Sequence, residues 1–395
     1  MMGNNVFVSE SVTAGHPDKL CDRISDAIVD RFLAQDSLAR VDVECAMATG
    51  IVFVASHYAA NLAPDVVEIA RRVIAGSGYR GSDFNARDCT VMTTLHERTD
   101  LSRSPGDEEE LSDEELGRLA TNDPVTVFGF ACAESPTLMP LPIHLAHGLA
   151  RALDTARESG KLPWLHPDGS VQVAVRYHDG VPESIHSLTL NPSLLAAGVG
   201  QRTLRSSLMS AVVEPAFRGQ SLRPDRKTRI LIAPPDLLRT GGPSRHAGLT
   251  GRKTAIDAYG EYTRTSGSAL SGKDPLRTDR IAVYGARWAA KNLVAAGLAQ
   301  FCEVLLSYEM GRAEPVSVQV RSFGSSDLDD EELTARVKRH FDFRPGALMR
   351  VFGLRRLVAT AENGYLQHLA AYGHVGREDL DLPWERRDRL EELAG

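Results

Sequence analysis

The sequence predicts an α+β protein with more than one domain, and three observations support this fold class. The chain of 395 residues is longer than one typical hydrophobic core, so two or three domains are expected. Helical and strand patterns are interspersed along the chain. Several strand candidates alternate apolar with polar residues, which is typical of sheets with one exposed face and disfavours an all-parallel sheet covered on both faces.

The first hundred residues predict a helix, a hairpin, a second helix and a further strand. Residues 17–33 place apolar side chains on one helical face, and Pro17 suits the first helical position. Residues 41–47 alternate like a half-buried strand and, with residues 51–54 after Gly50, predict a β-hairpin. A helix at residues 66–74 and a strand at residues 89–94 complete this unit.

Residues 97–119 differ from their surroundings because they contain two acidic runs, DEEE and SDEE. They predict an exposed loop with a short surface helix, which serves either as a plain linker or as a mobile lid. Beyond it we expect strands at residues 127–132, 171–177, 229–233 and 304–306. We expect helices at residues 144–158, 204–213, 281–299 and 332–341, the last of which should end the regular structure.

Composition narrows the class of function. The formal net charge of −7 argues against a nucleic-acid or anionic-membrane surface, which needs a basic excess. No stretch of about 18 apolar residues and no signal peptide is visible, so no membrane association is expected. The five cysteines are isolated and form no C-x-x-C pair, which fits reduced thiols in the cytoplasm better than disulfides or a cysteine-based zinc site.

A first polar motif, SESVTAGHPDK at residues 9–19, stands at the start of the first predicted helix. Helix N-termini present free N–H groups that suit phosphate, and His16 and Lys19 add further donors. Asp18 offers oxygen ligands for Mg²⁺. The alternative interpretation is ordinary helix capping with surface charge.

Two further motifs are rich in glycine and cations. Residues 241–253 contain several glycines followed by Arg252 and Lys253. The glycines allow the backbone to approach a phosphate closely, and the two cationic side chains can bind its oxygens. Residues 266–275 place Lys273 after a glycine, but Asp274 follows it, so the spacing is not that of a P-loop. Each motif alone is weak support for phosphate binding.

In this order and spacing, the three motifs resemble the signatures of S-adenosylmethionine synthetases. The resemblance extends over almost the whole chain, including LPWL at residues 162–165 and AYGH at residues 371–374. It implies three similar α/β domains around a pseudo-threefold axis, with approximate limits at residues 1–101, 113–232 and 233–395. It also implies a homodimer or homotetramer with active sites between subunits.

The resemblance implies that the methionine sulfur attacks C5′ of ATP and that the released triphosphate is then hydrolysed. His16, Arg252 and Lys273 match residues at the triphosphate and are expected to be catalytic. The implied ATP-binding set adds Asp168, Lys253 and Ala269. Asp18 and Asp279 match Mg²⁺ ligands, and Glu44 matches the carboxylate of a K⁺ site.

The acceptor pocket departs from the family pattern. His57 stands where the family has Glu, Arg98 replaces Gln, and His246 replaces Asp. Arg277 replaces a lysine, and Asp123 is retained from its motif. Other departures are Ser170 in place of lysine and Leu237–Leu238 in place of an Arg-Phe pair at the adenine.

These changes remove the hydrogen-bond acceptors that the ammonium group of methionine needs. The first hypothesis is therefore adenosyl transfer from ATP to a small anionic acceptor, or to water, and not only to methionine. One alternative is an ordinary S-adenosylmethionine synthetase with an unusual pocket. Another is a weakly active homologue that binds a true synthetase, which the two retained Mg²⁺ carboxylates disfavour.

Overall fold

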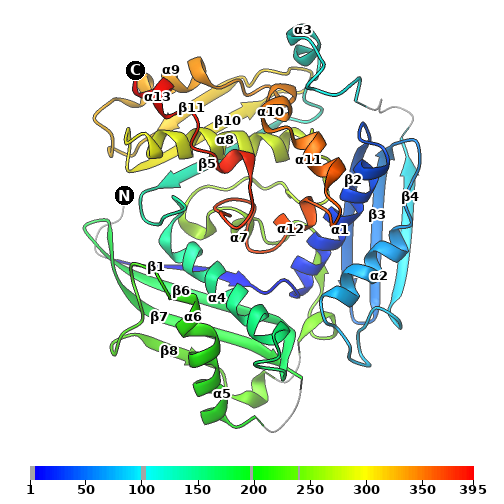
Figure 1. The fold of residues 1–395 in the computed structure, drawn as a ribbon, viewed down its shortest axis with the longest axis vertical. Helices are drawn as coiled ribbons and strands as arrows, with labels where there is room; N and C mark the ends of the chain where they lie inside the picture. The colour runs from blue at the N-terminus through cyan, green and yellow to red at the C-terminus, as the bar shows by residue number, and fades with distance from the viewer. Residues whose placement is uncertain (1–4, 99–103, 196–198, 239–240) are drawn as a thin grey trace.

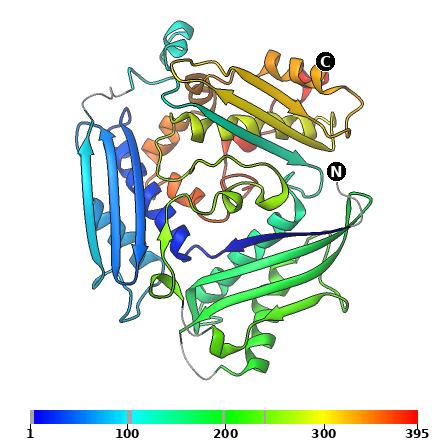
Figure 2. The same cartoon turned by 180° about the vertical axis from the view of Figure 1, so that it is seen from behind.

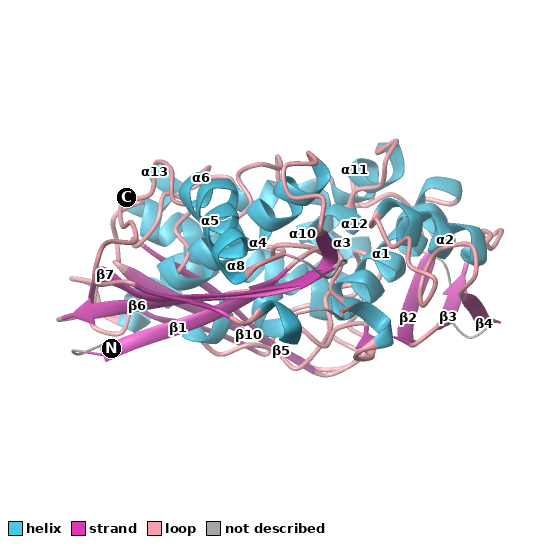
Figure 3. Ribbon diagram, turned by 90° about the horizontal axis from the view of Figure 1, so that it is seen from below, coloured by secondary structure: helices cyan, strands magenta, loops and turns pink. Residues whose placement is uncertain are grey.

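The computed structural model describes residues 5–98, 104–195, 199–238 and 241–395 and contains three β-sheets, each with helices against one face. Figure 1 shows these three sheet-and-helix units arranged around a centre that includes helix α7 (Thr254–Asp257). Figure 3 shows that most of the helices lie in one layer, on one side of the strands. The predicted α+β class with three similar units around a central axis is confirmed.

The first unit contains a sheet with the order β4-β3-β2-β9. Its strands are β2 (Arg40–Ala48), β3 (Ile51–Ala59), β4 (Thr90–Glu97) and β9 (Gly248–Leu249). Strands β2 and β3 form the predicted antiparallel hairpin, and β4 adds to β3 in parallel. Helices α1 (Pro17–Gln35) and α2 (Val66–Gly76), both predicted from the sequence, lie on one face of this sheet.

The second unit contains a sheet with the order β1-β6-β7-β8. Its strands are β1 (Asn5–Val12), β6 (Leu165–His178), β7 (Val181–Leu194) and β8 (Arg229–Ile232). Helices α4 (Leu141–Glu158), α5 (Gln201–Leu208) and α6 (Glu214–Ala216) belong to this unit. The sequence does not predict β1, which pairs antiparallel with β6 across more than 150 positions of the chain.

The third unit contains β5 (Val125–Cys132), β10 (Phe301–Tyr308) and β11 (Ser317–Arg321) in the order β11-β10-β5. Helix α8 (Thr278–Ala295) packs on β5 and β10, and α9 (Asp330–His340) packs on β11. Viewed from behind in Figure 2, the three sheets face the reader without helices in front of them.

The prediction that regular structure ends near residue 341 is wrong. Four short helices follow: α10 (Pro345–Phe352), α11 (Leu354–Thr360), α12 (Leu366–Leu369) and α13 (Leu390–Ala394). Each spans eight residues or fewer, which is too short for a helical apolar period to be recognised. Gly353, in the left-handed conformation, separates the first two.

The acidic segment contains the expected short helix, α3 (Asp113–Gly117), which begins with a capping box between Ser112 and Glu115. The segment is not exposed throughout, because Glu108 is buried and forms an ion pair with Arg355. Residues 99–103 lie outside the described part of the chain. Across the described residues, the helices do not combine the length and apolarity that a membrane span requires.

Candidate functional site

Helix α1 places the first polar motif at the junction between β1 and the helix. His16 is the N-cap residue of α1, and its Nδ1 accepts a hydrogen bond of 3.2 Å from the backbone N–H of Asp18. Pro17 follows at the first helical position, as predicted. The cap uses only one of the two ring nitrogens of His16, so the other nitrogen is left for a further contact.

Four aspartates along α1 connect this helix to loops that are distant in the sequence. They are Asp18, Asp22, Asp26 and Asp30, all buried, and the spacing of four residues puts them on one helical face. Each accepts a backbone N–H: from Leu249 (3.0 Å), Gly251 (2.7 Å), Gly272 (2.9 Å) and Leu366 (2.9 Å), respectively. Of these four aspartates only Asp18 is a predicted site residue, although the D-x-x-x-D repeat is visible in the sequence.

The two glycine-rich motifs are therefore held against α1 by buried carboxylates. Gly272 has φ +83°, and a side chain there would collide with the backbone carbonyl of Val43 in β2. Gly251, at φ +74°, leaves no room for a Cβ because Ala269 packs on it. Ala269, a predicted ATP-contacting residue, thus joins the second motif to the third. Lys19, which belongs to the first motif, is fully buried in ion pairs with Asp22 and Asp257.

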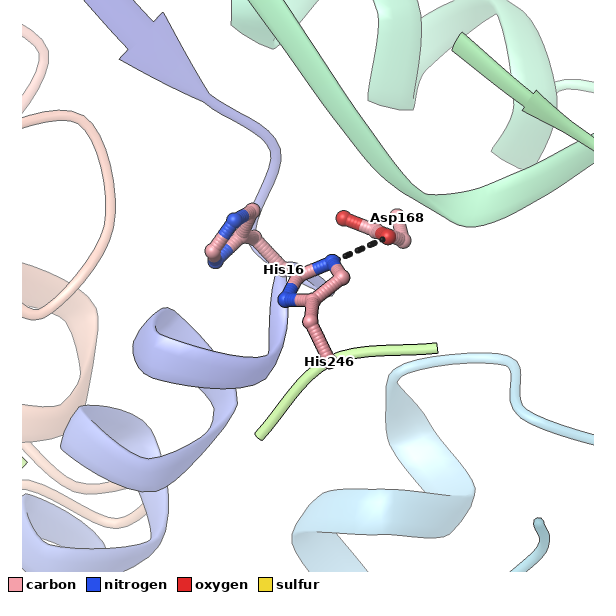
Figure 4. Close-up of side chains that lie close together, drawn as sticks. All are labelled: His16, Asp168 and His246. Atoms are coloured by element: carbon pink, nitrogen blue, oxygen red, sulfur yellow. Dashed lines mark hydrogen bonds and ion pairs between the residues drawn. The ribbon is translucent and has the colours of Figure 1, made fainter. Parts of the chain in front are cut away.

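His16, Asp168 and His246 form what we term the first polar cluster (Figure 4). They come from the start of α1, from β6 and from the loop before β9. His246 Nε2 lies 3.1 Å from Asp168 Oδ2, which also accepts the backbone N–H of Gly242 at 2.8 Å. The His16 and His246 ring centroids are 4.9 Å apart. The structure thus brings together two predicted ATP-binding residues and one predicted acceptor residue.

The protonation states in the first polar cluster are set by burial and by hydrogen bonds. Burial lowers the pKa of His16 to about 3, against the opposing charge of Asp168. Burial alone would raise the pKa of Asp168, but the hydrogen bond from His246, with His16 and the Gly242 amide, holds it below its ordinary value. At neutral pH the imidazole of His16 is therefore uncharged, while Asp168 is ionised.

A cavity of about 340 Å³ opens beside this cluster. His16, Asp168 and His246 line it together with Ser170, Asn191, Ser193, Leu237, Leu238 and Arg245. Ser170, Leu237–Leu238 and His246 are four of the positions at which the resemblance implies a departure from the family pattern. These four lie in the same cavity as His16 and Asp168, whereas His57, Arg98 and Arg277 do not line it.

A second polar cluster surrounds the start of α8 and contains Asp42, Asp123, Lys273, Arg277 and Asp279. Lys273 forms an ion pair with Asp279. Arg277 lies 3.2 Å from Asp42 and 3.1 Å from Asp123. Burial raises the pKa of Asp42 to about 6, although Arg277 opposes this shift. Asp42 Oδ1 is buried and has no hydrogen-bond partner among the described residues, so the cluster retains an unused oxygen ligand.

Arg252 and Lys253 extend from the turn after β9. Arg252 is more than half exposed and lies 3.8 Å from Asp18 Oδ1, and Lys253 lies 3.8 Å from Glu10. Burial raises the pKa of Asp18, although the Leu249 amide and Arg252 oppose this shift. In this structure the predicted phosphate-binding cations thus lie close to carboxylates. When ATP and Mg²⁺ bind, the cationic side chains can contact phosphate and the carboxylates can contact Mg²⁺.

The remaining predicted residues lie on the first unit's sheet. His57 (β3) is exposed, faces Asp42 in the register of β2 and packs edge-on against His96 of β4. Arg98 follows β4, and its backbone N–H donates to Tyr58. Glu44 is exposed on β2, opposite Ala55. His57 and Arg98 therefore lie at the same end of the sheet. His57 pairs with Asp42, which belongs to the second polar cluster. His246, the other predicted acceptor residue, belongs to the first polar cluster.

Comparison with known proteins identifies relatives of the whole chain. Models of the S-adenosylmethionine synthetase N-terminal, central and C-terminal domains match residues 4–100, 118–237 and 240–386, respectively. The S-adenosylmethionine synthase of Gloeothece citriformis (strain PCC 7424) is 44% identical over 401 residues, covering 98% of this chain and 95% of the relative.

Two further relatives carry the same name. The S-adenosylmethionine synthase of Trichodesmium erythraeum (strain IMS101) is 43% identical over 408 residues, covering 100% of this chain and 97% of the relative. That of Synechococcus elongatus (strain ATCC 33912 / PCC 7942 / FACHB-805) is 43% identical over 402 residues, covering 98% and 96%.

Proposed function

The chain belongs to the S-adenosylmethionine synthetase family and is a transferase of the methionine adenosyltransferase type, and from this premise we propose that it joins the adenosyl group of ATP to methionine. In this reaction the methionine sulfur attacks C5′ of ATP, and the triphosphate leaves. The observation that carries the proposal is the end-to-end similarity, at 43–44% identity, to relatives named S-adenosylmethionine synthase.

The geometry of His16 supports a role at the triphosphate. Because Nδ1 accepts the Asp18 amide and the imidazole is neutral, the proton resides on Nε2. An Nε2–H group at a helix N-terminus donates a hydrogen bond to a phosphate oxygen without carrying a charge of its own. We assign to His16 the stabilisation of negative charge that develops on the leaving triphosphate.

Arg252, Lys253 and Lys273 are proposed to neutralise the triphosphate. The leaving group gains charge at the bridging oxygen, so cationic side chains accelerate its departure. Arg252 and Lys253 approach from the turn after β9, and Lys273 from the loop that Asp26 holds. Asp168 and Ala269 are proposed to contact other parts of ATP.

The carboxylates suit the implied cations. Mg²⁺ binds oxygen ligands, usually one or two carboxylates together with substrate phosphates. Asp18 and Asp279 each supply such oxygens beside a predicted phosphate-binding cation, and the buried Asp42 Oδ1 adds an unused one. When bound, Mg²⁺ would screen the phosphate charge. Glu44 is proposed as the carboxylate of a K⁺ site.

We propose that the active site is shared between subunits, because the two polar clusters of one chain lie beside separate cavities. The sheet face that carries His57 and Glu44 is not covered by helices (Figure 3). On the same face, Ile51, Phe53, Met92 and Leu249 are between 41% and 52% exposed. Apolar residues gathered on an uncovered sheet face are typical of a protein interface. We therefore propose a homodimer or larger homo-oligomer that covers this face.

The comparisons favour methionine over the anionic acceptor or water of the first hypothesis, and they give no support to a role restricted to binding a true synthetase. One observation still favours a non-methionine acceptor as the second candidate. His246 contacts the Asp168 carboxylate, so a cationic or neutral ring stands where the family has an acid.

Product analysis separates the two candidates. Purified protein is incubated with ATP and Mg²⁺, with and without methionine, and adenosine-containing products are identified by mass spectrometry. S-adenosylmethionine formed only with methionine supports the proposal. Adenosine or another adenosyl product formed at the same rate without methionine contradicts it and favours the second candidate.

A further inference from the structure

Beyond the roles proposed for His16 and Asp168 at ATP, the first polar cluster is a group of side chains that can ligate a metal ion. Ring nitrogens of His16 and His246 and a carboxylate oxygen of Asp168 all lie within 4.8 Å of one another. Figure 4 shows the three side chains approaching from three different segments of the chain. His246 supplies the second imidazole, so the set of two imidazoles and one carboxylate depends on this residue.

We propose that His16, Asp168 and His246 form a binding site for a divalent transition-metal ion, with Zn²⁺ as the representative. Two imidazoles and one carboxylate are a common ligand set for Zn²⁺ and similar ions. Mg²⁺ prefers oxygen ligands in octahedral geometry, so it competes weakly for this set. The site is therefore chemically distinct from the carboxylates assigned to Mg²⁺. It shares His16 and Asp168 with the proposed ATP site, so the ion is expected to bind the nucleotide-free protein.

The distances require only a small adjustment of side chains. Zn²⁺ lies about 2.0–2.2 Å from N and O ligands, so tetrahedral ligand atoms are about 3.4 Å apart. His246 Nε2 and Asp168 Oδ2 are already 3.1 Å apart. Bringing the third ligand from within 4.8 Å to this spacing shortens each of its two distances by about 1.4 Å at most.

The surrounding groups suit a bound ion. The Gly242 amide donates to Asp168 Oδ2 and keeps this carboxylate oriented. Asp18 Oδ2 lies 3.8 Å from His16 Nδ1. When Nε2 binds an ion, Nδ1 carries the proton and donates toward this carboxylate, in place of accepting the Asp18 amide. A carboxylate behind a metal-bound histidine is a frequent supporting arrangement.

The site is also accessible. The side chain of His246 is 39% exposed, and all three ligands line the cavity that also contains Ser170 and Asn191. Three protein ligands leave a fourth position open toward this cavity for water or an anionic group. An ion can therefore enter from solvent without unfolding of the surrounding loops.

The test measures metal binding by the full-length, nucleotide-free protein in excess Mg²⁺. Calorimetry with Zn²⁺ should give one site per chain, and Co²⁺ should give the visible absorption of a tetrahedral site. His246→Ala and Asp168→Asn should each weaken Zn²⁺ binding by at least about 100-fold, since even supporting groups contribute 10–100-fold.

A matched control is His178→Ala, which removes an exposed histidine 3.6 Å from Asp179 and should leave Zn²⁺ affinity unchanged. His246 lies in a partly exposed loop, so His246→Ala should keep the wild-type unfolding temperature even if Asp168→Asn does not. Absence of Zn²⁺ binding by the wild type, or unchanged affinity in His246→Ala, would overturn the proposal. Neither result depends on whether the protein uses methionine.

Discussion

Arg280 of α8 and Asp26 of α1 form an ion pair in which both side chains are fully buried. The guanidinium donates to both carboxylate oxygens, at 2.8 and 3.3 Å, and also donates to the carbonyl of Lys273 at 2.8 Å. Asp26 additionally accepts the amide of Gly272. This one pair therefore connects two units of the fold and holds the loop that carries Lys273.

Replacing Asp26 with Asn should destabilise the protein strongly. The substitution leaves Arg280 as a buried charge without its partner, which typically costs about 3–5 kcal/mol. The measurement is the urea midpoint of unfolding. Arg118→Ala removes an exposed ion pair with Glu114 and serves as the control, because exposed pairs contribute about 1 kcal/mol or less. Equal midpoints for the two variants would contradict the assigned role of Asp26.

Lys273→Ala should weaken ATP binding by at least about tenfold, because a cation on a partly buried phosphate contributes a few kcal/mol. Calorimetry with the Mg²⁺ complex of a non-hydrolysable ATP analogue measures the affinity. Lys161, an exposed lysine in the turn before β6, provides the control variant Lys161→Ala, which should bind like the wild type. An unchanged affinity in Lys273→Ala would exclude a contact between this lysine and the triphosphate.

The metal assignments predict two separate effects on the rate, one on its Mg²⁺ dependence and one on its stimulation by K⁺. Asp18→Asn and Asp279→Asn should each raise the Mg²⁺ concentration needed for half-maximal rate, because a carboxylate ligand becomes a neutral amide. Glu44→Gln should abolish stimulation by K⁺ while leaving the Mg²⁺ dependence unchanged. Initial rates at varied Mg²⁺ and K⁺ test both assignments. Full turnover in excess chelator would rule out a metal role for the two aspartates, and a wild-type K⁺ response in Glu44→Gln would exclude that site.

Buried histidines predict a loss of stability in acid. Burial lowers the pKa of His147 well below its ordinary value, and its Nε2 has no hydrogen-bond partner among the described residues. The unfolded chain binds a proton at this histidine below about pH 6.5, whereas the folded protein does not. Because only the unfolded chain binds this proton, the free energy of unfolding falls as the pH drops below about 6.5, by up to about 1.4 kcal/mol per pH unit.

The variant His147→Asn isolates this effect. Asparagine can retain the contact that His147 Nδ1 makes with Ser11 at 2.9 Å, but it does not titrate. The free energy of unfolding, measured between pH 5 and 8, should therefore fall less steeply toward acid than in the wild type. His178→Asn, at an exposed position, should leave the slope unchanged. Parallel curves for His147→Asn and the wild type would show that His147 protonates in the folded protein.

Long periodic elements could be predicted from the sequence, whereas long-range pairing could not. The helix that begins at Pro17 and the hairpin of β2 and β3 have clear apolar periods and turn signals. The sequence does not predict strand β1, because residues 9–12 of this strand begin the first polar motif and its partner, β6, is distant in the sequence. The helices after residue 341 are too short to show a period.

The same limit applies to the site. Local motifs indicated His16, Arg252 and Lys273, because each has a phosphate-binding context in its own segment. The contact between His246 and Asp168 joins residues 78 positions apart, and no local pattern predicts it. The aspartate repeat of α1 was visible, but its function depends on loops that only the fold brings to the helix.

We expect methionine to be used, but with a KM that His57→Glu lowers. His57 faces Asp42 at the end of β3, and Asp42 in turn contacts Arg277. A glutamate at this position can accept hydrogen bonds from an ammonium group, a contact that contributes about 1.5–3 kcal/mol. This corresponds to a gain of at least about tenfold in kcat/KM for methionine.

The neighbouring strand offers a matched control for this experiment. His96 is the register partner of His57 on β4, is also exposed, and packs against it with ring centroids 5.6 Å apart. His96→Glu makes the same change of charge one strand away and should leave the KM for methionine unchanged. If both variants lower KM alike, the effect is a general change of the local potential and not an anchor for the amino group. If His57→Glu leaves kcat/KM for methionine unchanged or lowers it, the amino group is bound elsewhere. The acceptor assignment of His57 is then wrong, whichever nucleophile the protein uses.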